Sequence, residues 1–462
     1  MPDQTSPSAL PLPSDVRDAL VAQTSAIFPS VIEDLRALVT IPSVSAPAFD
    51  QAHVAASARA VADLLAEVGL ENVEIVSTPG GAPAVLAHHE ADAGAPHVVL
   101  YAHHDVQPPG EGWSTNPFEP TLVGERLYGR GAADDKAGIM AHVGALRVLR
   151  EVYGTDLPVS VTVFVEGEEE IGSPTFGAFL EAYGDRVAGD VIVVADSANW
   201  KVGIPALTTS LRGLVDLTVR LDVLDHAVHS GMFGGPVLDA LTLMARLIAT
   251  LHDDDGAVAV AGLVHGSAAD LDFPEEMFRQ EAGVLEGAAL TGRGSIPERL
   301  WAQPALAVIG IDAPSVAMAS NTIAHTASAK LSLRIAPGQD PAAAEAALIA
   351  HLQSHAPFGA KVSVTPGEQG NAFLAPSSTP AMALAKLAFA AAWETEPVEV
   401  GMGGSIPFIA DLLRVAPQAE ILITGVEDPD SRAHSSDESV HLGELQRAVL
   451  AEAFLLASLR RA

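Results

Sequence analysis

Four glutamates crowd five positions of the segment EGEEEIGS, residues 166–173, directly after the apolar run PVSVTVFV, residues 158–165. Carboxylates this close together repel one another unless water or a cation compensates their charge. Two interpretations fit the run: a solvated acidic turn, or a site where a cation lies among the carboxylates. The acidity of the whole chain favours the solvated turn when this run is considered alone.

A second polar group follows another apolar run, in which VVLYA, residues 98–102, leads into His103, His104 and Asp105. In an extended segment the side chains of His103 and Asp105 point the same way. A carboxylate behind a metal-binding histidine fixes its tautomer and raises its basicity. An ordinary turn at the end of a strand also uses these residue types, so both interpretations stay open here. His104 should face away, and we interpret it as structural.

Two more apolar runs end in the same manner. VIVVA, residues 191–195, leads into Asp196, and ILITGV, residues 421–426, leads across a loop to His434. Ligands of open α/β sheets bind beyond the carboxyl ends of the strands. Because four such ends carry histidine, aspartate or glutamate, the sequence indicates a metal site at this edge of a sheet.

The segment GRGAADDKAG, residues 129–138, places Asp134 and Asp135 just before an expected helix. An aspartate at this position often caps the helix by accepting hydrogen bonds from backbone N–H groups of the first turn. A carboxylate beside irregular, glycine-rich backbone is also suited to bridge two metal ions. From this segment alone, capping is the favoured interpretation.

Three other features carry weak signals by themselves. His229 lies in the glycine-rich loop 225–235, where a lone histidine is usually solvated. Arg334 lies on the polar face of an expected strand, and residues 401–409, GMGGSIPFI, offer flexible backbone and free N–H groups.

The elements that must position these residues alternate between helix and strand from about residue 28 to residue 206. Helical spacing is found in 51–70 and 137–152, and short apolar runs typical of buried parallel strands occupy 96–102, 159–165 and 190–195. Helix and strand alternate again in 379–393 and 419–426. This order predicts an α/β catalytic domain, residues 16–206 and 374–462, with a mostly parallel sheet and helices on both faces.

The pattern changes between residues 207 and 373. Segments 214–221 and 326–335 alternate strictly between apolar and polar residues, as strands of a sheet with one exposed face do. Pro236 is expected to open one helix, and Asp340 with Pro341 to cap and open another. We therefore expect residues 207–373 to form an inserted α+β domain.

Composition excludes several classes of function. With 462 residues and a formal charge of -33, the chain should repel nucleic acids and anionic membranes, so we expect neither as a partner. It has no cysteine, so a thiolate metal site or nucleophile is excluded. Residues 1–15 lack the features of a signal peptide, and we expect them to be a disordered tail. No uncharged apolar segment is long enough to span a bilayer. We therefore expect a cytoplasmic protein.

Taken together, eight segments resemble the M20 metallopeptidase family, and most closely its carnosinase-like dipeptidase branch. They occur in the family's order between about residues 100 and 440: YAHHDVQP, LYGRGAADDKAG, EGEEEIGS, VVADSANW, HSGMFGG, SLRIAPG, GGSIPFI and AHSSDESV. The resemblance implies two divalent metal ions, zinc first and manganese or cobalt as alternatives. It also implies a non-proline cis peptide between Asp134 and Asp135.

The same resemblance implies a role for each matching residue. The inserted domain would be a lid through which two copies dimerise. Glu166 and Glu168 remain flanking acidic residues, solvated at the surface. By this resemblance His103 and Asp196 would bind one ion, Glu170 and His434 would bind the other, and Asp134 would bridge the two. Asp105 would orient His103, and Glu169 would be the general base. His229 would stabilise the oxyanion in the partner's site, and Arg334, Gly404 and Ser405 would bind the substrate carboxylate.

These roles describe hydrolysis of the peptide bond in dipeptides or short unblocked peptides. A deacylase or desuccinylase of N-acyl amino acids would use the same chemistry. A metal-binding protein that has lost catalysis on this scaffold is an alternative of another class, which the presence of Glu169 and all five implied ligands argues against.

Overall fold

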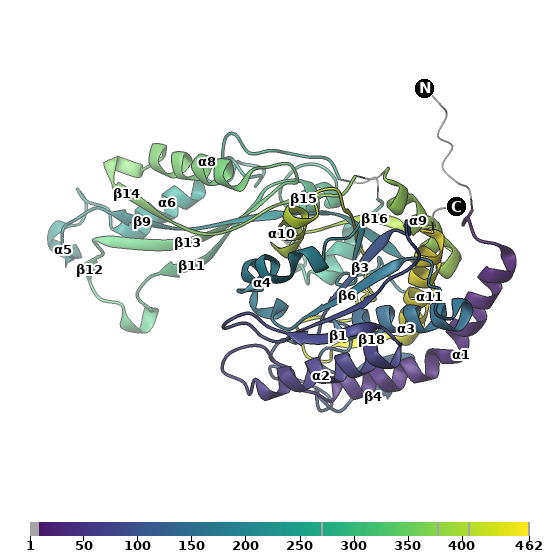
Figure 1. Ribbon diagram of the computed structural model, residues 1–462. Coiled ribbons are helices and arrows are strands. Elements are labelled where there is room, and N and C mark those ends of the chain that lie inside the picture. Colours follow the sequence, from purple (N-terminus) through teal and green to yellow (C-terminus); the bar gives the residue numbers. More distant parts are fainter. Residues whose placement is uncertain (1–8, 269–270, 377, 405–406, 461–462) are drawn as a thin grey trace, which may run out of the picture. The chain divides into compact units, whose positions relative to one another are not determined.

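The computed structural model describes residues 9–268, 271–376, 378–404 and 407–460 (Figure 1). The chain divides into two compact units, one comprising Met1–Thr209, Ala375–Glu399 and Phe408–Ala462, and the other Ser210–Leu374 and Val400–Pro407. The sequence prediction placed the two main breaks at 206/207 and 373/374. It did not place the segment Val400–Pro407 with the inserted residues.

The main sheet has nine strands within the described residues, in the order β1-β2-β6-β3-β7-β17-β8-β15, with β16 also paired to β8. The central strands β6, β3, β7 and β17 are parallel, whereas the pairs toward both edges are antiparallel. The sheet is therefore mixed, with a parallel centre. Its strands are β1 Glu71–Val76, β2 Ala84–His89, β3 His97–His103, β6 Ser160–Glu166, β7 Val191–Val194, β8 Ala206–Leu211, β15 Phe373–Leu374, β16 Val398–Met402 and β17 Glu420–Ile423.

Helices cover both faces of this sheet (Figure 1), which is why its central strands are continuous apolar runs. On one face Phe164 of β6 stacks on Phe179 of α4 at 4.6 Å between ring centroids, and Tyr101 of β3 packs on Phe408 of α10 at 4.1 Å. On the other face α3 packs against α1 and α11. The helices are α1 Ser14–Val39, α2 Ala52–Glu67, α3 Lys136–Tyr153, α4 Phe176–Tyr183, α9 Pro380–Trp393, α10 Pro407–Val415 and α11 Leu442–Ser458.

A buried polar link holds α3 and α11 to the centre of the sheet. Nδ1 of His142 lies 2.9 Å from both carboxylate oxygens of Glu452, and its Nε2 lies 2.9 Å from the carbonyl oxygen of Tyr101. Both ring nitrogens are thus satisfied inside the core, as buried polar groups require. This link fixes the helices beneath the strand that ends at His103.

A small three-stranded sheet, in the order β18-β5-β4, borders the loop that carries His434. Its strands are β4 Thr121–Val123, β5 Arg126–Tyr128 and β18 Ser439–His441. Arg126 donates hydrogen bonds to Asp428 and to the hydroxyl of Ser439, and so joins the two ends of that loop.

The second unit contains an antiparallel sheet of four strands within the described residues, in the order β11-β13-β9-β14. One face of β9 and β13 packs against α6 and α8 in a core of aliphatic side chains, while the alternate residues lie outside that core. The predicted alternation is confirmed. The elements of this unit are β9 Gly213–Asp222, β10 Val228–His229, α5 Ser230–Phe233, α6 Ala240–Ala249, α7 Glu275–Glu281, β11 Ala305–Asp312, β12 Thr322–Ile323, β13 Thr326–Ile335, α8 Pro341–Ser354 and β14 Lys361–Gly370.

One predicted helix start in this unit is wrong and one is confirmed. Helix α6 begins at Ala240, not at Pro236, because Asp239 caps it by accepting a 2.8 Å hydrogen bond from the N–H of Thr242. Helix α8 begins as predicted, with Pro341 in its first turn and the Asp340 side chain as its cap.

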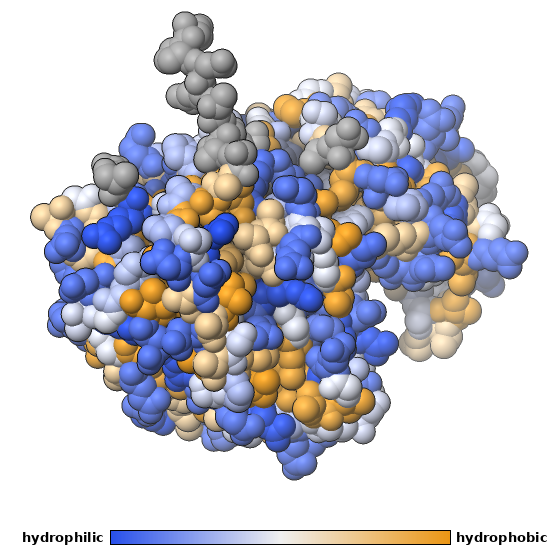
Figure 2. All heavy atoms as spheres, turned by 90° about the vertical axis from the view of Figure 1, so that its right-hand side faces the viewer, coloured by the Kyte–Doolittle hydropathy of each residue, from blue (hydrophilic) through white to orange (hydrophobic). Residues whose placement is uncertain are grey.

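The amino-terminal segment also differs from its prediction. Residues 1–8 lie outside the described residues, but α1 begins at Ser14, inside the expected tail, and Leu10 is buried. No helix in the described part of the chain is long and apolar enough to cross a membrane. On the face shown in Figure 2, hydrophilic and hydrophobic residues are interspersed.

Candidate metal centre

The structure brings the five predicted metal ligands together at the carboxyl edge of the parallel strands. Two groups of side chains each hold their potential ligand atoms within 4.8 Å of one another: His103, Asp134 and Asp196 in one, and Asp134, Glu170 and His434 in the other. Asp134 belongs to both. Its Oδ1 lies 3.0 Å from Nε2 of His103, and its Oδ2 lies 2.9 Å from Nε2 of His434. One carboxylate oxygen therefore faces each group, as a bridging ligand requires.

The ionisation of these side chains shows how strongly the site needs positive charge. Hydrogen bonds to Asp134 and Glu170 raise the pKa of His434 to about 11. Burial lowers the basicity of His103, but its hydrogen bonds to Asp105 and Asp134 outweigh this effect and raise its pKa well above the ordinary value. Burial also raises the pKa of Asp196 to about 6. Protons thus supply the charge that cations would otherwise supply.

Two imidazoles and three carboxylates form a donor set that suits divalent ions such as zinc, manganese or cobalt. Because ligands must be deprotonated to bind a metal, occupation of this site would release the protons of His103 and His434. The residues present therefore fit a site for divalent metal ions.

Asp105 does more than face His103. Nδ1 of His103 lies 3.1 Å from the carbonyl oxygen of Asp105 and 3.4 Å from its Oδ1. The two carboxylate oxygens of Asp105 also accept hydrogen bonds from the backbone N–H groups of Glu169 and Glu170, at 3.2 and 3.1 Å. One buried carboxylate thus holds the first histidine and the glutamate turn in a fixed relation.

The expectation that Glu166 and Glu168 are solvated is wrong, because both are buried. Glu166 accepts a 2.8 Å hydrogen bond from the hydroxyl of Tyr101. Glu168 accepts hydrogen bonds from the N–H of Ala82 and from the N–H and hydroxyl of Thr175, at 2.7 to 2.9 Å. These two glutamates fasten the turn to neighbouring segments.

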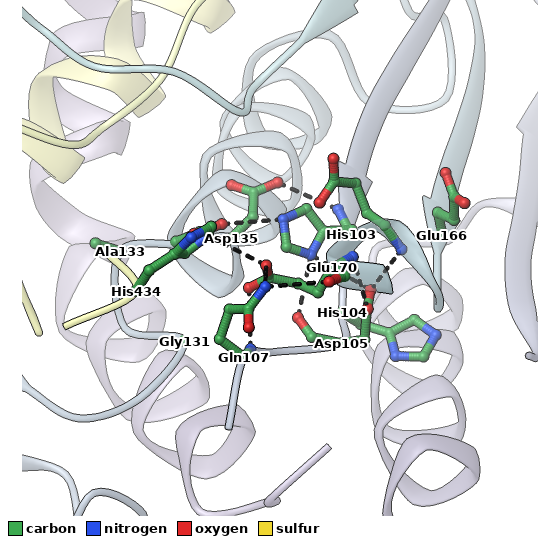
Figure 3. Close-up of polar contacts among 12 residues, drawn as sticks. His103, His104, Asp105, Gln107, Gly131, Ala133, Asp135, Glu166, Glu170 and His434 are labelled. Atoms are coloured by element: carbon green, nitrogen blue, oxygen red, sulfur yellow. Dashed lines mark hydrogen bonds and ion pairs between the residues drawn. The ribbon is translucent and has the colours of Figure 1, made fainter. Parts of the chain in front are cut away.

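Glu169 and Glu170, which form the first residues of a short 3-10 turn, have different surroundings. Gln107 holds Glu170: its N–H donates to Oε1 at 3.0 Å, and its side-chain amide donates to Oε2 at 2.8 Å (Figure 3). The carboxylate of Glu169 has no hydrogen bond or ion pair with any described residue. Burial, reinforced by the nearby charge of Asp196, raises the pKa of Glu169 to about 9. Of the four glutamates, Glu169 alone keeps its carboxylate available.

The loop before α3 corrects the capping interpretation. Asp135 occupies the cap position, but its side chain makes no capping hydrogen bond and instead accepts one from the N–H of His103 at 3.2 Å. The peptide bond between Asp134 and Asp135 is cis, as the resemblance implied. His104 points away from the other labelled side chains (Figure 3) and lies 2.8 Å from the carbonyl oxygen of Pro83, so its structural interpretation is confirmed.

Sequence reasoning missed the residue that holds this loop. The buried carboxylate of Glu438 accepts a 2.6 Å hydrogen bond from Arg130 and three more from the N–H groups of Gly131, Ala133 and Asp134, at 3.0 to 3.1 Å. Glu438 lies four positions after His434. Glu438 therefore ties together the segments that carry two candidate ligands, Asp134 and His434. The only hint in the sequence was that Glu438 lies within the AHSSDESV motif, where it had been assigned no role.

Three other predicted residues lie in the second unit. His229 is exposed at the end of β10, where its Nδ1 accepts a 3.1 Å hydrogen bond from the N–H of Gly231. Arg334 lies on β13, on the face opposite the aliphatic core, and a Cβ added at Gly404 would meet no atom of another described residue within 4 Å. Ser405 falls outside the described residues.

Replacement of Glu438 by glutamine should weaken metal binding. An amide group can accept at one atom only, and its NH₂ would face two of the N–H donors that position the Asp134 loop. We expect metal affinity to fall by roughly 10- to 100-fold, as measured by competition with a chromogenic chelator.

Glu452→Gln is the matched control, since it disturbs another buried carboxylate that binds none of these N–H groups. Equal metal affinity in the two variants, at comparable melting temperatures, would contradict the positioning role of Glu438.

The sequence and the fold are similar to those of known peptidases. The model of peptidase family M20/M25/M40 matches residues 99–457. The cysteinylglycine-S-conjugate dipeptidase of Corynebacterium striatum is 35% identical over 408 residues, which cover 87% of this chain and 89% of that protein.

Two solved dipeptidase structures share the fold over nearly the whole chain. Human carnosine dipeptidase 1 has a TM-score of 0.76 at 26% identity, covering 98% of this chain and 100% of its own. The dipeptidase Dug1p of Saccharomyces cerevisiae has a TM-score of 0.78 at 21% identity, covering 96% and 99%, and shows the fold alone. The resemblance to the carnosinase-like branch is confirmed, and the chain belongs to peptidase family M20/M25/M40 as a hydrolase of the metallopeptidase class.

Proposed function

We propose that this protein is a dipeptidase that hydrolyses the peptide bond of dipeptides or short unblocked peptides, with Glu169 as its general base. The observation that carries the proposal is the contrast within the glutamate run. Glu170 lies in a ligand group and is held by Gln107, whereas Glu169, next to it, has no partner among the described residues and a raised pKa. A base that shuttles protons needs such a free carboxylate in a partly desolvated place.

His103 and Asp196 would hold one divalent ion, Glu170 and His434 a second, and Asp134 would bridge them. Zinc is our first candidate for this donor set, with manganese or cobalt as alternatives. Divalent ions held by these residues would supply Lewis acidity, which polarises a peptide carbonyl and lowers the pKa of a water molecule.

Glu169 would take the proton of that water and deliver it to the leaving amine. Its pKa of about 9 without cations should fall when cations occupy the site, since positive charge favours the carboxylate. Asp105 would keep the tautomer of His103 fixed while it holds the turn that carries Glu169. Arg334, Gly404 and Ser405 would hold the carboxylate end of the substrate.

His229 would stabilise the oxyanion in the partner's site of a homodimer. Two features of the second unit support an association of two copies. His229 is exposed and bound to no described side chain. Strand β11 lies at the edge of its sheet and exposes Val308, Ile309 and Ile311 by 40%, 54% and 52%. An apolar edge strand of this kind is suited to pair with another chain.

The substrate class is tested by a hydrolysis panel of free dipeptides against N-acetyl and N-succinyl amino acids. The named activity of the Corynebacterium striatum relative, a dipeptidase of cysteinylglycine conjugates, favours the free dipeptides. We expect turnover of free dipeptides in the presence of zinc or manganese, and loss of that turnover after chelation. Turnover of the acylated substrates alone would establish the deacylase alternative instead.

Substitution of Glu169 by glutamine should abolish turnover but not metal binding. The amide keeps the shape of the side chain and cannot accept the proton of the water, so we expect kcat to fall by roughly 1,000-fold or more. Metal content, measured by atomic absorption, should stay at the wild-type level.

The adjacent Glu170→Gln variant provides the contrast, because it should lose metal as well as activity. Normal turnover in the Glu169→Gln variant would remove Glu169 from the mechanism.

A mixed dimer tests the shared site. We expect His229→Ala and Glu169→Ala proteins to be nearly inactive separately and to regain part of the activity after subunit exchange. In the mixed dimer one site receives an intact His229 from one subunit and an intact Glu169 from the other. If exchange is confirmed by mass-tagged subunits and no activity returns, His229 does not act across the dimer.

A further inference from the structure

A cavity of about 450 Å³ lies in the first unit, beside the loop between β17 and β18 that carries His434. Three segments line it: residues 114–115, the hairpin of β4 and β5, and the loop itself. Its volume falls within the usual range for sites that bind small molecules. None of its lining residues is a candidate metal ligand. The cavity is therefore a separate candidate site for a ligand.

Several donor groups at this cavity lack partners. The side chain of Arg432 has no hydrogen bond or ion pair with a described residue, and the hydroxyl of Tyr128 has no hydrogen bond with one. Oγ1 of Thr115 is buried without a hydrogen-bond partner in the described part of the chain. An unmade hydrogen bond at a buried group costs stability. Three side chains that line one cavity, each from a different segment, therefore keep unused donors.

The acidic groups at the cavity differ from one another. Both carboxylate oxygens of Asp437 accept hydrogen bonds from Ser114, at 2.7 Å from its N–H and 2.9 Å from its hydroxyl. These hydrogen bonds, with the charge of Arg432 as a weaker contribution, lower the pKa of Asp437. The exposed carboxylate of Asp430 has no hydrogen bond or ion pair with a described residue. One unpaired carboxylate therefore lies at the same cavity as one unpaired guanidinium.

The balance of charge selects the class of ligand. Asp430 and the charge of -33 on the whole chain disfavour a plain anion, and Arg432 with Arg126 disfavours a plain cation. A small zwitterion, with one carboxylate and one ammonium group, satisfies both signs. The exposed side chain of Val123 and the ring of Tyr128 add an apolar wall. A free amino acid has this chemistry, and so has an intact dipeptide.

We propose that this cavity is a second ligand site of the protein, which binds a small zwitterion of the amino-acid class. The carboxylate of the ligand accepts hydrogen bonds from Arg432, Tyr128 and Thr115, and its ammonium group pairs with Asp430. A guanidinium suits a carboxylate because it forms charge-assisted hydrogen bonds, which are the stronger kind. The site goes beyond the proposed function, since binding here requires no peptide hydrolysis.

The position of the site gives its occupant an effect on the loop of a candidate metal ligand. Arg432 and Asp437 lie on either side of His434, and Arg432, His434 and Asp437 have positive φ, of 56°, 62° and 61°. Residues other than glycine adopt this left-handed backbone only where their surroundings hold it. A ligand that joins Arg432 to β5 and to residues 114–115 would hold the loop in this form. Occupation should therefore slow the opening of the loop.

Equilibrium dialysis of labelled L-leucine against the metal-loaded protein tests the site. We expect the wild type to bind leucine at a site that Arg432→Met weakens about tenfold or more, because a charge-assisted hydrogen bond is lost. Thr115→Val replaces a hydroxyl by a methyl group on another segment and should weaken the same site about threefold or more. Leucine bound at the metal centre would respond to neither change, since neither residue is a candidate ligand.

Arg414→Met is the matched control, because Arg414 is exposed, pairs with Asp411 and lies outside the cavity. It should leave leucine binding unchanged. Leucine amide and N-acetyl-leucine each lack one of the two charges and should bind about tenfold more weakly than leucine. Leucyl-leucine, measured with the Glu169→Gln protein so that it stays intact, shows which of the two zwitterions the site prefers.

Hydrogen exchange of peptides that cover residues 427–438 measures the effect on the loop. Saturating leucine, or leucyl-leucine if the site prefers it, should slow exchange there in the wild type and not in Arg432→Met.

Two results would overturn the site: no binding of either zwitterion that depends on Arg432 and Thr115, or equal binding of N-acetyl-leucine and leucine. Unchanged exchange with the site filled would overturn its effect on the loop. If Arg432→Met does not fold, as judged by its melting temperature, Thr115→Val decides the question. Dialysis measures binding alone, so a failure here leaves the proposed function untouched. A protein that hydrolyses no dipeptide would refute the proposed function and leave the site standing.

Discussion

The carboxylate of Asp134 faces two ways, with one oxygen 3.0 Å from His103 and the other 2.9 Å from His434. Around it, Asp196, Glu169 and Glu170 crowd three more carboxyl groups into a largely buried place, and ionisation of Glu169 and Asp196 is opposed there. Such an arrangement is unfavourable unless positive charge is present. The histidines, and in a metallopeptidase the divalent ions, supply it. The fold has to hold these groups close together against their mutual repulsion.

The fold meets this constraint with buried carboxylates that accept hydrogen bonds from backbone N–H groups. Asp105 binds two N–H groups of the glutamate turn, Glu168 binds two that join this turn to residues 82 and 175, and Glu438 binds three in the loop of Asp134. These hydrogen bonds are charge-assisted and bind backbone N–H groups. They therefore fix the backbone positions from which the ligand side chains extend. The acidity of the chain thus serves its internal structure as well as its surface.

The sequence by itself determined the central strands, several main helices and the approximate place of the chemistry. Apolar runs marked the central strands, strict alternation marked β9 and β13, and four runs ended in histidine, aspartate or glutamate. These signals are local, because a strand or helix and the residue that ends it lie within one short window. The order of motifs added the family, since a set of eight segments is far more specific than any one of them.

The family resemblance assigned different roles to Glu169 and Glu170, but only the tertiary structure showed which acidic residues are buried anchors. Glu166, Glu168, Glu169 and Glu170 look alike in the sequence, yet two are buried anchors, one lies in a ligand group and the carboxylate of one has no partner among the described residues. The distinguishing contacts join distant positions, such as Glu168 to Ala82 and Glu438 to Ala133, 86 and 305 residues apart. The same reason hid the role of Gln107, which holds Glu170. Local periodicity carries no information about partners that only folding brings together.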